Sequence, residues 1–310
     1  MDYLPVIACL LMAVGMGSND TSNATGICIG SGILRLKQAV VFFGLLVLIG
    51  ITVQGERVMR TVGRDIVEVD AVVVSLACTV SALLVIASNW KKIPLSVLQV
   101  MIGSLAGAGA GAGLAVNYPK LGQILLSWAI SPFIALVFGN LLYRAMEAAL
   151  SRYPVFSIER ALRFLLLCSS VLIAYNTGAN SLATILGPAI HVGAIGAYEG
   201  FVAGSLFVFL GAYFLSYRVV DTVGKGITAL DPFSGFSAQF GAGACVLLFT
   251  FLGMPVSTTY CIIGGISGVG LVKGMHTVKR SLIVQILRNW IFGPIVGFSI
   301  CYLIQAIIHA

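Results

Sequence analysis

The stretch MGSNDTSNATG at residues 16–26 and the stretch TGANSLATILG at residues 177–187 interrupt two apolar segments with polar residues. The second stretch lies 161 residues after the first, and the same offset pairs further residues over about a hundred positions. The pairs include Arg57 with Arg218, Thr61 with Thr222, Gly63 with Gly224, Asp70 with Asp231, Pro94 with Pro255, Ser96 with Ser257, and Gly103 with Gly264. This register indicates two internal repeats. Paired polar breaks in their apolar segments are typical of the central binding site of a secondary transporter.

The composition is that of a membrane protein. Of the 310 residues, 59% are hydrophobic and 9% are charged, whereas soluble domains carry about 25% charged residues. Apolar runs approaching the roughly 20 residues of a membrane helix occur at 3–16, 38–54, 70–88, 122–143, 198–217, 238–253 and 281–308. Long unbroken runs favour helices over the short alternating segments of a membrane barrel. We therefore predict an all-α polytopic membrane protein that lies in the lipid bilayer of the cell membrane.

The polar stretch between the two copies sets the predicted boundary. We predict a first transmembrane repeat at 1–148, a linker at 149–160 and a second transmembrane repeat at 161–310. Gly-rich segments at 93–116 and 254–273 are predicted to be re-entrant and hairpin-like, because irregular backbone in lipid must be buried or line a cavity. Close helix packing through small residues is the alternative explanation. An odd number of crossings per repeat would give the repeats inverted topology, with the two polar stretches meeting near the midplane.

The first polar stretch offers oxygen ligands. On a helix Asn19 and Asn23 share one face, and Asp20 lies beside them. One carboxylate and amide carbonyls, without sulfur or imidazole, suit Na⁺ or another hard cation. An ionisable residue such as Asp20 at membrane depth is a functional candidate by default. For the two asparagines, interhelical hydrogen bonding is the alternative role.

The second Gly-rich segment is preceded by polar residues that suit an anion. Residues 255–259 read Pro-Val-Ser-Thr-Thr. A proline near a helix start, hydroxyl groups in the first turn and free backbone N–H groups together favour binding of an oxyanion.

These motifs resemble the signature of the inorganic phosphate transporter family (Pit type), which includes a sulfate permease branch. The resemblance covers essentially the whole chain and implies inverted repeats that carry phosphate or sulfate together with Na⁺ or H⁺. It implies an anion site formed by Asp20, Asn23, Ser96, Ser257, Thr258 and Thr259. It also implies cation ligands at Asn19, Asp20, Asn180, Ser181 and Thr184, with Na⁺ as a candidate at the first three of these.

The chain also departs from the family pattern. Ser181 and Thr184 occupy positions where the second motif of the family has Asp and Asn. The first hairpin segment keeps Pro94 and Ser96 but lacks both threonines and the histidine, and Tyr260 replaces the histidine of the second. The site therefore has one carboxylate fewer, which leaves the number of coupled cations and the identity of the anion open.

We predict a secondary active transporter of inorganic phosphate, coupled to Na⁺ or H⁺, that works by alternating access. Phosphate keeps a P–OH near neutral pH that can pair with Asp20, whereas sulfate has no such proton. Sulfate is the alternative substrate, and an anion channel is the remoter alternative.

Other classes of protein fit the sequence poorly. No H-E-x-x-H motif and no paired aspartates on separate spans occur, so we expect no enzyme. Seven scattered cysteines without a C-x-x-C pair predict no metal centre or disulfide framework. The basic residues lie in short loops, as is usual in membrane proteins, and predict no nucleic-acid partner. No cofactor besides the coupling ion is expected, and a homodimer is one candidate assembly.

Overall fold

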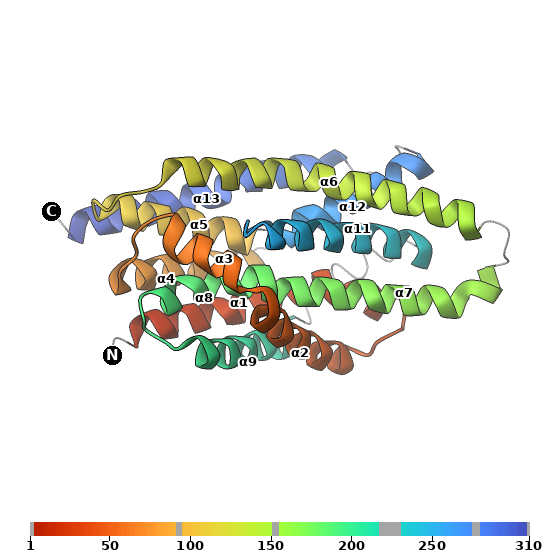
Figure 1. The fold of residues 1–310 in the computed structure, drawn as a ribbon, viewed down its shortest axis with the longest axis horizontal. Coiled ribbons are helices and arrows are strands. Elements are labelled where there is room, and N and C mark those ends of the chain that lie inside the picture. Colours follow the sequence, from red (N-terminus) through yellow and green to blue (C-terminus); the bar gives the residue numbers. More distant parts are fainter. Residues whose placement is uncertain (1–2, 91–94, 151–154, 217–230, 275–279, 309–310) are drawn as a thin grey trace.

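The chain folds into a bundle of long helices. The computed structural model describes residues 3–90, 95–150, 155–216, 231–274 and 280–308. The described helices run roughly along the long axis of the molecule, and α1 (Leu4–Gly30) begins at the end where α13 (Arg280–Ile308) finishes (Figure 1). Eight helical segments of the described residues are long and apolar enough to cross a membrane. This architecture confirms the predicted all-α polytopic membrane fold.

One span is missing from the apolar runs predicted from the sequence. α7 (Val155–Asn176), the π-helical segment η2 (Thr177–Leu182) and α8 (Ala183–His191) follow one another without interruption, and residues 159–191 of this unit form a candidate span. Its mean hydropathy is 1.4, against 2.2 for α2 (Leu36–Gln54). The value is low because the second polar motif lies inside the span, and apolar run length alone therefore missed it.

The internal repeat reappears in the boundaries of the helices. α2 and α9 (Ala197–Leu215) are offset by 161 residues at both ends, and so are α4 (Ala71–Trp90) and α11 (Pro232–Phe251). Gly32 and Gly193, at equivalent positions after α1 and α8, have the same positive φ of 71°. Only glycine adopts this backbone conformation freely, so the two copies leave their first span by the same turn.

In the first repeat, α4 and α5 (Val97–Gly111) form hairpin 1. α5 has 15 residues, a length of about 22 Å that is short for a membrane crossing. Just outside the two helices, Val67 and Val116 form an antiparallel bridge, and the N–H of Asn117 donates to the carbonyl of Ile66 at 2.8 Å. The chain therefore enters and leaves hairpin 1 at the same end of the bundle, and the re-entrant unit includes α4 as well as α5.

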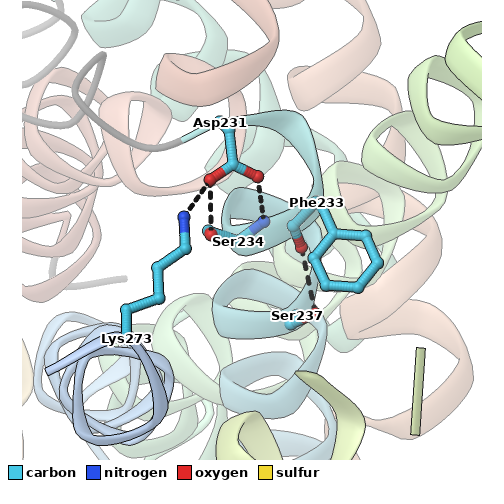
Figure 2. A network of polar contacts seen from close by, with 5 residues as sticks. All are labelled: Asp231, Phe233, Ser234, Ser237 and Lys273. Carbon is cyan, nitrogen blue, oxygen red and sulfur yellow. Dashed lines mark hydrogen bonds and ion pairs between the residues drawn. The ribbon is translucent and has the colours of Figure 1, made fainter. Parts of the chain in front are cut away.

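In the second repeat, α11 and α12 (Thr258–Lys273) form hairpin 2. The carboxylate of Asp231 accepts hydrogen bonds from the backbone N–H and the hydroxyl of Ser234 and pairs with Lys273 at the far end of the hairpin (Figure 2). Partial burial acts to raise the pKa of Asp231, but the bonds from Lys273 and Ser234 outweigh it and hold the pKa below its ordinary value of 3.8. Both ends of hairpin 2 thus lie together, as in hairpin 1.

The first repeat departs from the predicted broken helix. α1 continues as regular α-helix through the whole of the polar motif at 16–26. Its hydroxyl groups donate to carbonyls one turn earlier in the same helix, including Ser18 to Gly15 at 2.7 Å and Thr21 to Gly17 at 2.6 Å. Side chains that bond back to their own helix need no break in it. In the second repeat the motif does change the helix, which becomes π-helical at η2.

Each hairpin packs against the last helix of the other repeat. A Cβ added to Gly103 of hairpin 1 would lie 2.3 Å from the carbonyl oxygen of Pro294 in α13. A Cβ added to Gly264 of hairpin 2 would lie 2.1 Å from the carbonyl oxygen of Pro132 in α6 (Tyr118–Leu150). The glycines permit this approach of backbones, and the exchange joins the two halves into one bundle. Of the predicted linker, residues 149–150 end α6, residues 155–160 begin α7, and residues 151–154 lie outside the described part.

Candidate functional site

The two polar motifs meet inside the bundle at their equivalent positions. Asp20 on α1 and Ser181 on η2 are related by the repeat offset, and the hydroxyl of Ser181 hydrogen-bonds to the carboxylate of Asp20. The side-chain amide of Asn19 donates to the same carboxylate at 3.3 Å. Asp20 is 6% exposed and Ser181 is 1% exposed. A carboxylate is therefore held in the interior by neutral donors, without a basic partner among these contacts.

The second motif contributes its backbone as well as its side chains. A π-helical turn shifts carbonyls out of the regular α-helical ladder, and such turns are frequent at functional sites. Here the π-helical segment η2 covers residues 177–182, which begin the second polar stretch. The hydroxyl of Thr184 donates to the carbonyl of Asn180 at 2.8 Å. Together with Asp20, η2 thus brings several oxygen atoms to one point of the bundle.

Asn180 ties η2 to the turn of hairpin 2. Its side-chain nitrogen donates to the hydroxyl of Thr250 at 2.9 Å and to the carbonyl of Met254 at 3.0 Å, and its oxygen accepts from the N–H of Val256 at 3.0 Å. The equivalent Asn19 has only the bond to its neighbour Asp20 in the described part of the structure. The two repeats therefore differ: the turn of hairpin 2 is fastened to the central motif by an asparagine.

The N-terminus of α12 lies against α1. Asn23 donates from its side-chain nitrogen to the hydroxyl of Thr259 at 2.9 Å. Ser257 precedes the helix without using its hydroxyl to cap it, and the buried hydroxyl oxygen of Thr258 has no hydrogen-bond partner within the described residues. Asn19, Asn23 and Thr259 are half-buried, whereas most of their neighbours are fully buried. Polar groups of α1 and hairpin 2 are therefore both close together and accessible.

Ser96 lies at the corresponding N-terminus in hairpin 1. It precedes α5, is 6% exposed and makes no side-chain cap. No hydrogen bond of the described structure joins it to the predicted residues of α1 or η2. Pro94, which the sequence places at the turn of this hairpin, lies outside the described residues.

Sequence reasoning missed Gln99 as a candidate. This residue lies in the first turn of α5, is 1% exposed, and neither of its side-chain polar atoms has a partner among the described residues. The available signal was a glutamine in an otherwise apolar helix start, at the position that Tyr260 occupies in the second repeat.

The donor set around Asp20 fits a hard monovalent cation. It offers the carboxylate of Asp20, the amide oxygen of Asn19, the hydroxyl of Ser181 and nearby backbone carbonyls, which are all oxygen donors. Asn180 has one lone pair left on its amide oxygen after the bond from Val256. Thr184 uses its hydroxyl hydrogen on a carbonyl but keeps its oxygen lone pairs. No group of three His, Cys, Asp or Glu side chains that could hold a transition metal occurs within the part of the chain that the structure describes.

Comparison with known proteins assigns the chain to a family. The model of the phosphate transporter family matches residues 16–301. A Methanocaldococcus jannaschii protein named "Putative phosphate permease" is 35% identical over 94% of this chain and 93% of its own length. The sulfate permease CysP of Bacillus subtilis is 27% identical over 99% of this chain and 88% of its own.

A solved structure shares the fold of the chain. The structure titled "The sodium-dependent phosphate transporter" superposes with a TM-score of 0.86 at 20% sequence identity and covers 98% of both chains. The identity is low, so the likeness concerns the fold. With eight candidate spans and a family match over nearly its whole length, the chain is a multi-pass membrane protein of the phosphate transporter family.

Proposed function

We propose that the chain is a secondary active transporter that carries inorganic phosphate together with Na⁺ or H⁺. The observation that carries the proposal is the contact between Asp20 and Ser181 beside a hairpin whose helix N-terminus bonds to α1. A cation site and an anion site are thus adjacent in the interior. Family membership and the names of the relatives support transport of an inorganic oxyanion.

The proposed anion site lies at the N-termini of the two short helices. Its donors are the side-chain amide of Asn23, the hydroxyls of Ser96, Ser257, Thr258 and Thr259, and the free N–H groups of each first helical turn. These groups suit a phosphate because helix N-termini carry partial positive charge and unsatisfied donors. The burial of Ser96, Ser257 and Thr258, each at most 6% exposed, removes competing water from these donors.

Asp20 is the proposed link between cation and anion. A carboxylate deep in a membrane protein needs a cation or a proton to offset its charge. Na⁺ held by Asp20, Asn19, Asn180, Ser181 and Thr184 would supply that charge, and a proton on Asp20 would supply it equally. Either way the anion would meet a neutralised site, which couples the two solutes in a single binding step.

We infer that the two repeats have inverted topology. α1 leads away from the end where the chain begins, α2 returns, hairpin 1 enters and leaves at that end, and α6 crosses again (Figure 1). Three crossings are an odd number, so the second repeat starts from the opposite side of the membrane. Two inverted halves can exchange conformations, which is the basis of alternating access. The difference between Asn180 and Asn19 fits one half being fastened and the other free.

The protonation of the anion favours phosphate over sulfate. Hydrogen phosphate can donate its hydroxyl hydrogen to Asp20, whereas sulfate would place an oxygen without a proton against a carboxylate. Sites built to pair with a hydroxyl reject analogues that lack it by a large factor. Sulfate is the second candidate because Ser181 replaces a second carboxylate and a relative of similar length is named a sulfate permease.

The proposal is tested by uptake into proteoliposomes that contain the purified protein. Labelled phosphate and labelled sulfate are offered separately at pH 7, each with an inward Na⁺ gradient, an inward proton gradient or no gradient. We expect saturable phosphate accumulation that depends on one of the gradients. Uptake that is rapid, never saturates and ignores both gradients would indicate a channel, and absence of uptake of either anion would overturn the proposal.

A further inference from the structure

Gln99 is a buried amide that the fold leaves without a partner. It is 1% exposed, and both its side-chain oxygen and its side-chain nitrogen lack hydrogen bonds within the described residues. Burial of an unpaired amide is unfavourable, and native proteins contain few such groups. An amide of this kind is therefore a candidate for binding something other than the protein.

Another buried glutamine shows what a structural role looks like in this bundle. Gln239 in α11 is 0% exposed, and its oxygen accepts from the hydroxyl of Ser169 at 2.8 Å. Its nitrogen donates to the carbonyl of Ala24 at 2.7 Å. Both ends of Gln239 thus join helices to each other, and neither end of Gln99 does so.

The position of Gln99 directs it to the N-terminus of α5. Ser96 precedes the helix and Gln99 is its third residue, so the two side chains lie one turn apart on neighbouring faces. Helical side chains lean toward the N-terminus of their helix. The first backbone N–H groups of α5 have no partner inside the helix. A ligand at this helix end would therefore meet N–H groups, the hydroxyl of Ser96 and the amide of Gln99 together.

We propose that Gln99 is a specificity-determining residue of the anion site, an inference that rests on the proposed function. Its side-chain nitrogen donates to an oxygen of the bound phosphate, and its side-chain oxygen accepts the P–OH hydrogen of that phosphate. An amide offers both a donor and an acceptor, which is what a tetrahedral anion carrying one proton requires. Sulfate has no hydrogen for the amide oxygen, so Gln99 favours phosphate without adding a charge to the site.

The test uses variants that remove the amide and keep its volume. Gln99→Leu and the unbranched Gln99→Met are purified beside the wild type and the control Gln239→Leu. The first readout is the thermal stability of each protein in detergent, with and without inorganic phosphate. The second is the half-saturating concentration of phosphate and of sulfate for uptake into proteoliposomes.

We expect the two kinds of glutamine to behave differently. Gln99→Leu and Gln99→Met should be as stable as the wild type or more so, because replacing an unpaired buried amide by an apolar group is neutral or favourable. Their half-saturating phosphate concentration should rise about 10- to 100-fold, and the stabilisation by phosphate should shrink. The sulfate value should change less than the phosphate value. Gln239→Leu should lose stability because it breaks bonds between helices.

Two outcomes would overturn the role of Gln99. The first is that both Gln99 variants keep the phosphate and sulfate values of the wild type. The second is that both lose stability as Gln239→Leu does while phosphate still stabilises them fully. A wild type that neither binds nor accumulates phosphate would instead refute the proposed function, and the stability measurements separate that case from the first two.

Discussion

Replacing Asn180 by alanine should release the turn of hairpin 2. The side chain is fully buried and makes three hydrogen bonds, two as donor and one as acceptor. Alanine leaves the carbonyl of Met254 and the N–H of Val256 without these partners, whereas Thr250 keeps its own bond to the carbonyl of Val246 at 2.7 Å. Each orphaned buried group costs roughly 1–3 kcal/mol. We therefore expect a loss of about 3 kcal/mol for the two groups together.

The assay is thermal unfolding of the purified protein in detergent, followed by phosphate uptake in proteoliposomes. A loss of this size should lower the melting temperature by roughly 5 °C or more and slow the uptake. Asn19→Ala is the matched control, because Asn19 occupies the equivalent position and bonds only to Asp20 in the described part of the structure. Its effect on stability should stay below about 1 kcal/mol. Equal melting temperatures for the two variants would refute the idea that Asn180 fastens hairpin 2.

Three further changes follow from particular contacts. Asp20→Asn should abolish gradient-driven accumulation while leaving the fold intact, because it removes the only carboxylate of the two polar stretches; accumulation at the wild-type level would exclude it as the coupling group. Gly178→Ala should destabilise the protein by about 1–3 kcal/mol or more, since its Cβ would lie 2.0 Å from a backbone oxygen of α2, whereas Gly122→Ala, with nothing within 4 Å, should be neutral in the same melting assay. The lowered pKa of Asp231 means that its carboxylate contributes stability above its ordinary pKa of 3.8 and loses that contribution as the pH falls below it. Lys273→Ala should therefore reduce the loss of stability on acidification, by less than about 1 kcal/mol because the pair is partly exposed, and an unchanged pH profile would argue against the pair.

Much of the fold could be predicted because the membrane restricts it. Apolar composition and run length are enough to predict spanning helices, since lipid leaves few alternatives for the backbone. The same reasoning failed for residues 159–191, whose polar motif lowers the hydropathy of a genuine span. It also predicted a break in α1 that the helix avoids by bonding its hydroxyl groups to its own carbonyls.

The candidate site was predictable in its residue types and less so in its contacts. The offset of 161 residues identifies Asp20 and Ser181 as equivalent positions. Inverted copies that pack face to face bring equivalent positions together near their symmetry axis, and these two residues do hydrogen-bond. The offset equally relates Asn19 to Asn180, yet the two have different partners. Repetition in the sequence therefore indicates which residues correspond and leaves open which of them bond alike.

The sequence by itself determined the class of the protein, its two repeats and its family, because these depend on composition, spacing and short motifs. The tertiary structure decided which buried polar groups are used by the fold and which are left for a ligand. Asn180, Gln239 and Gln99 are all buried amides in apolar surroundings, and nothing local distinguishes them. The partners of the first two lie on helices 70 residues or more away along the chain. Only the packing of those helices supplies partners to Asn180 and Gln239 and none to Gln99, because a hydrogen bond requires two groups within about 3 Å of each other.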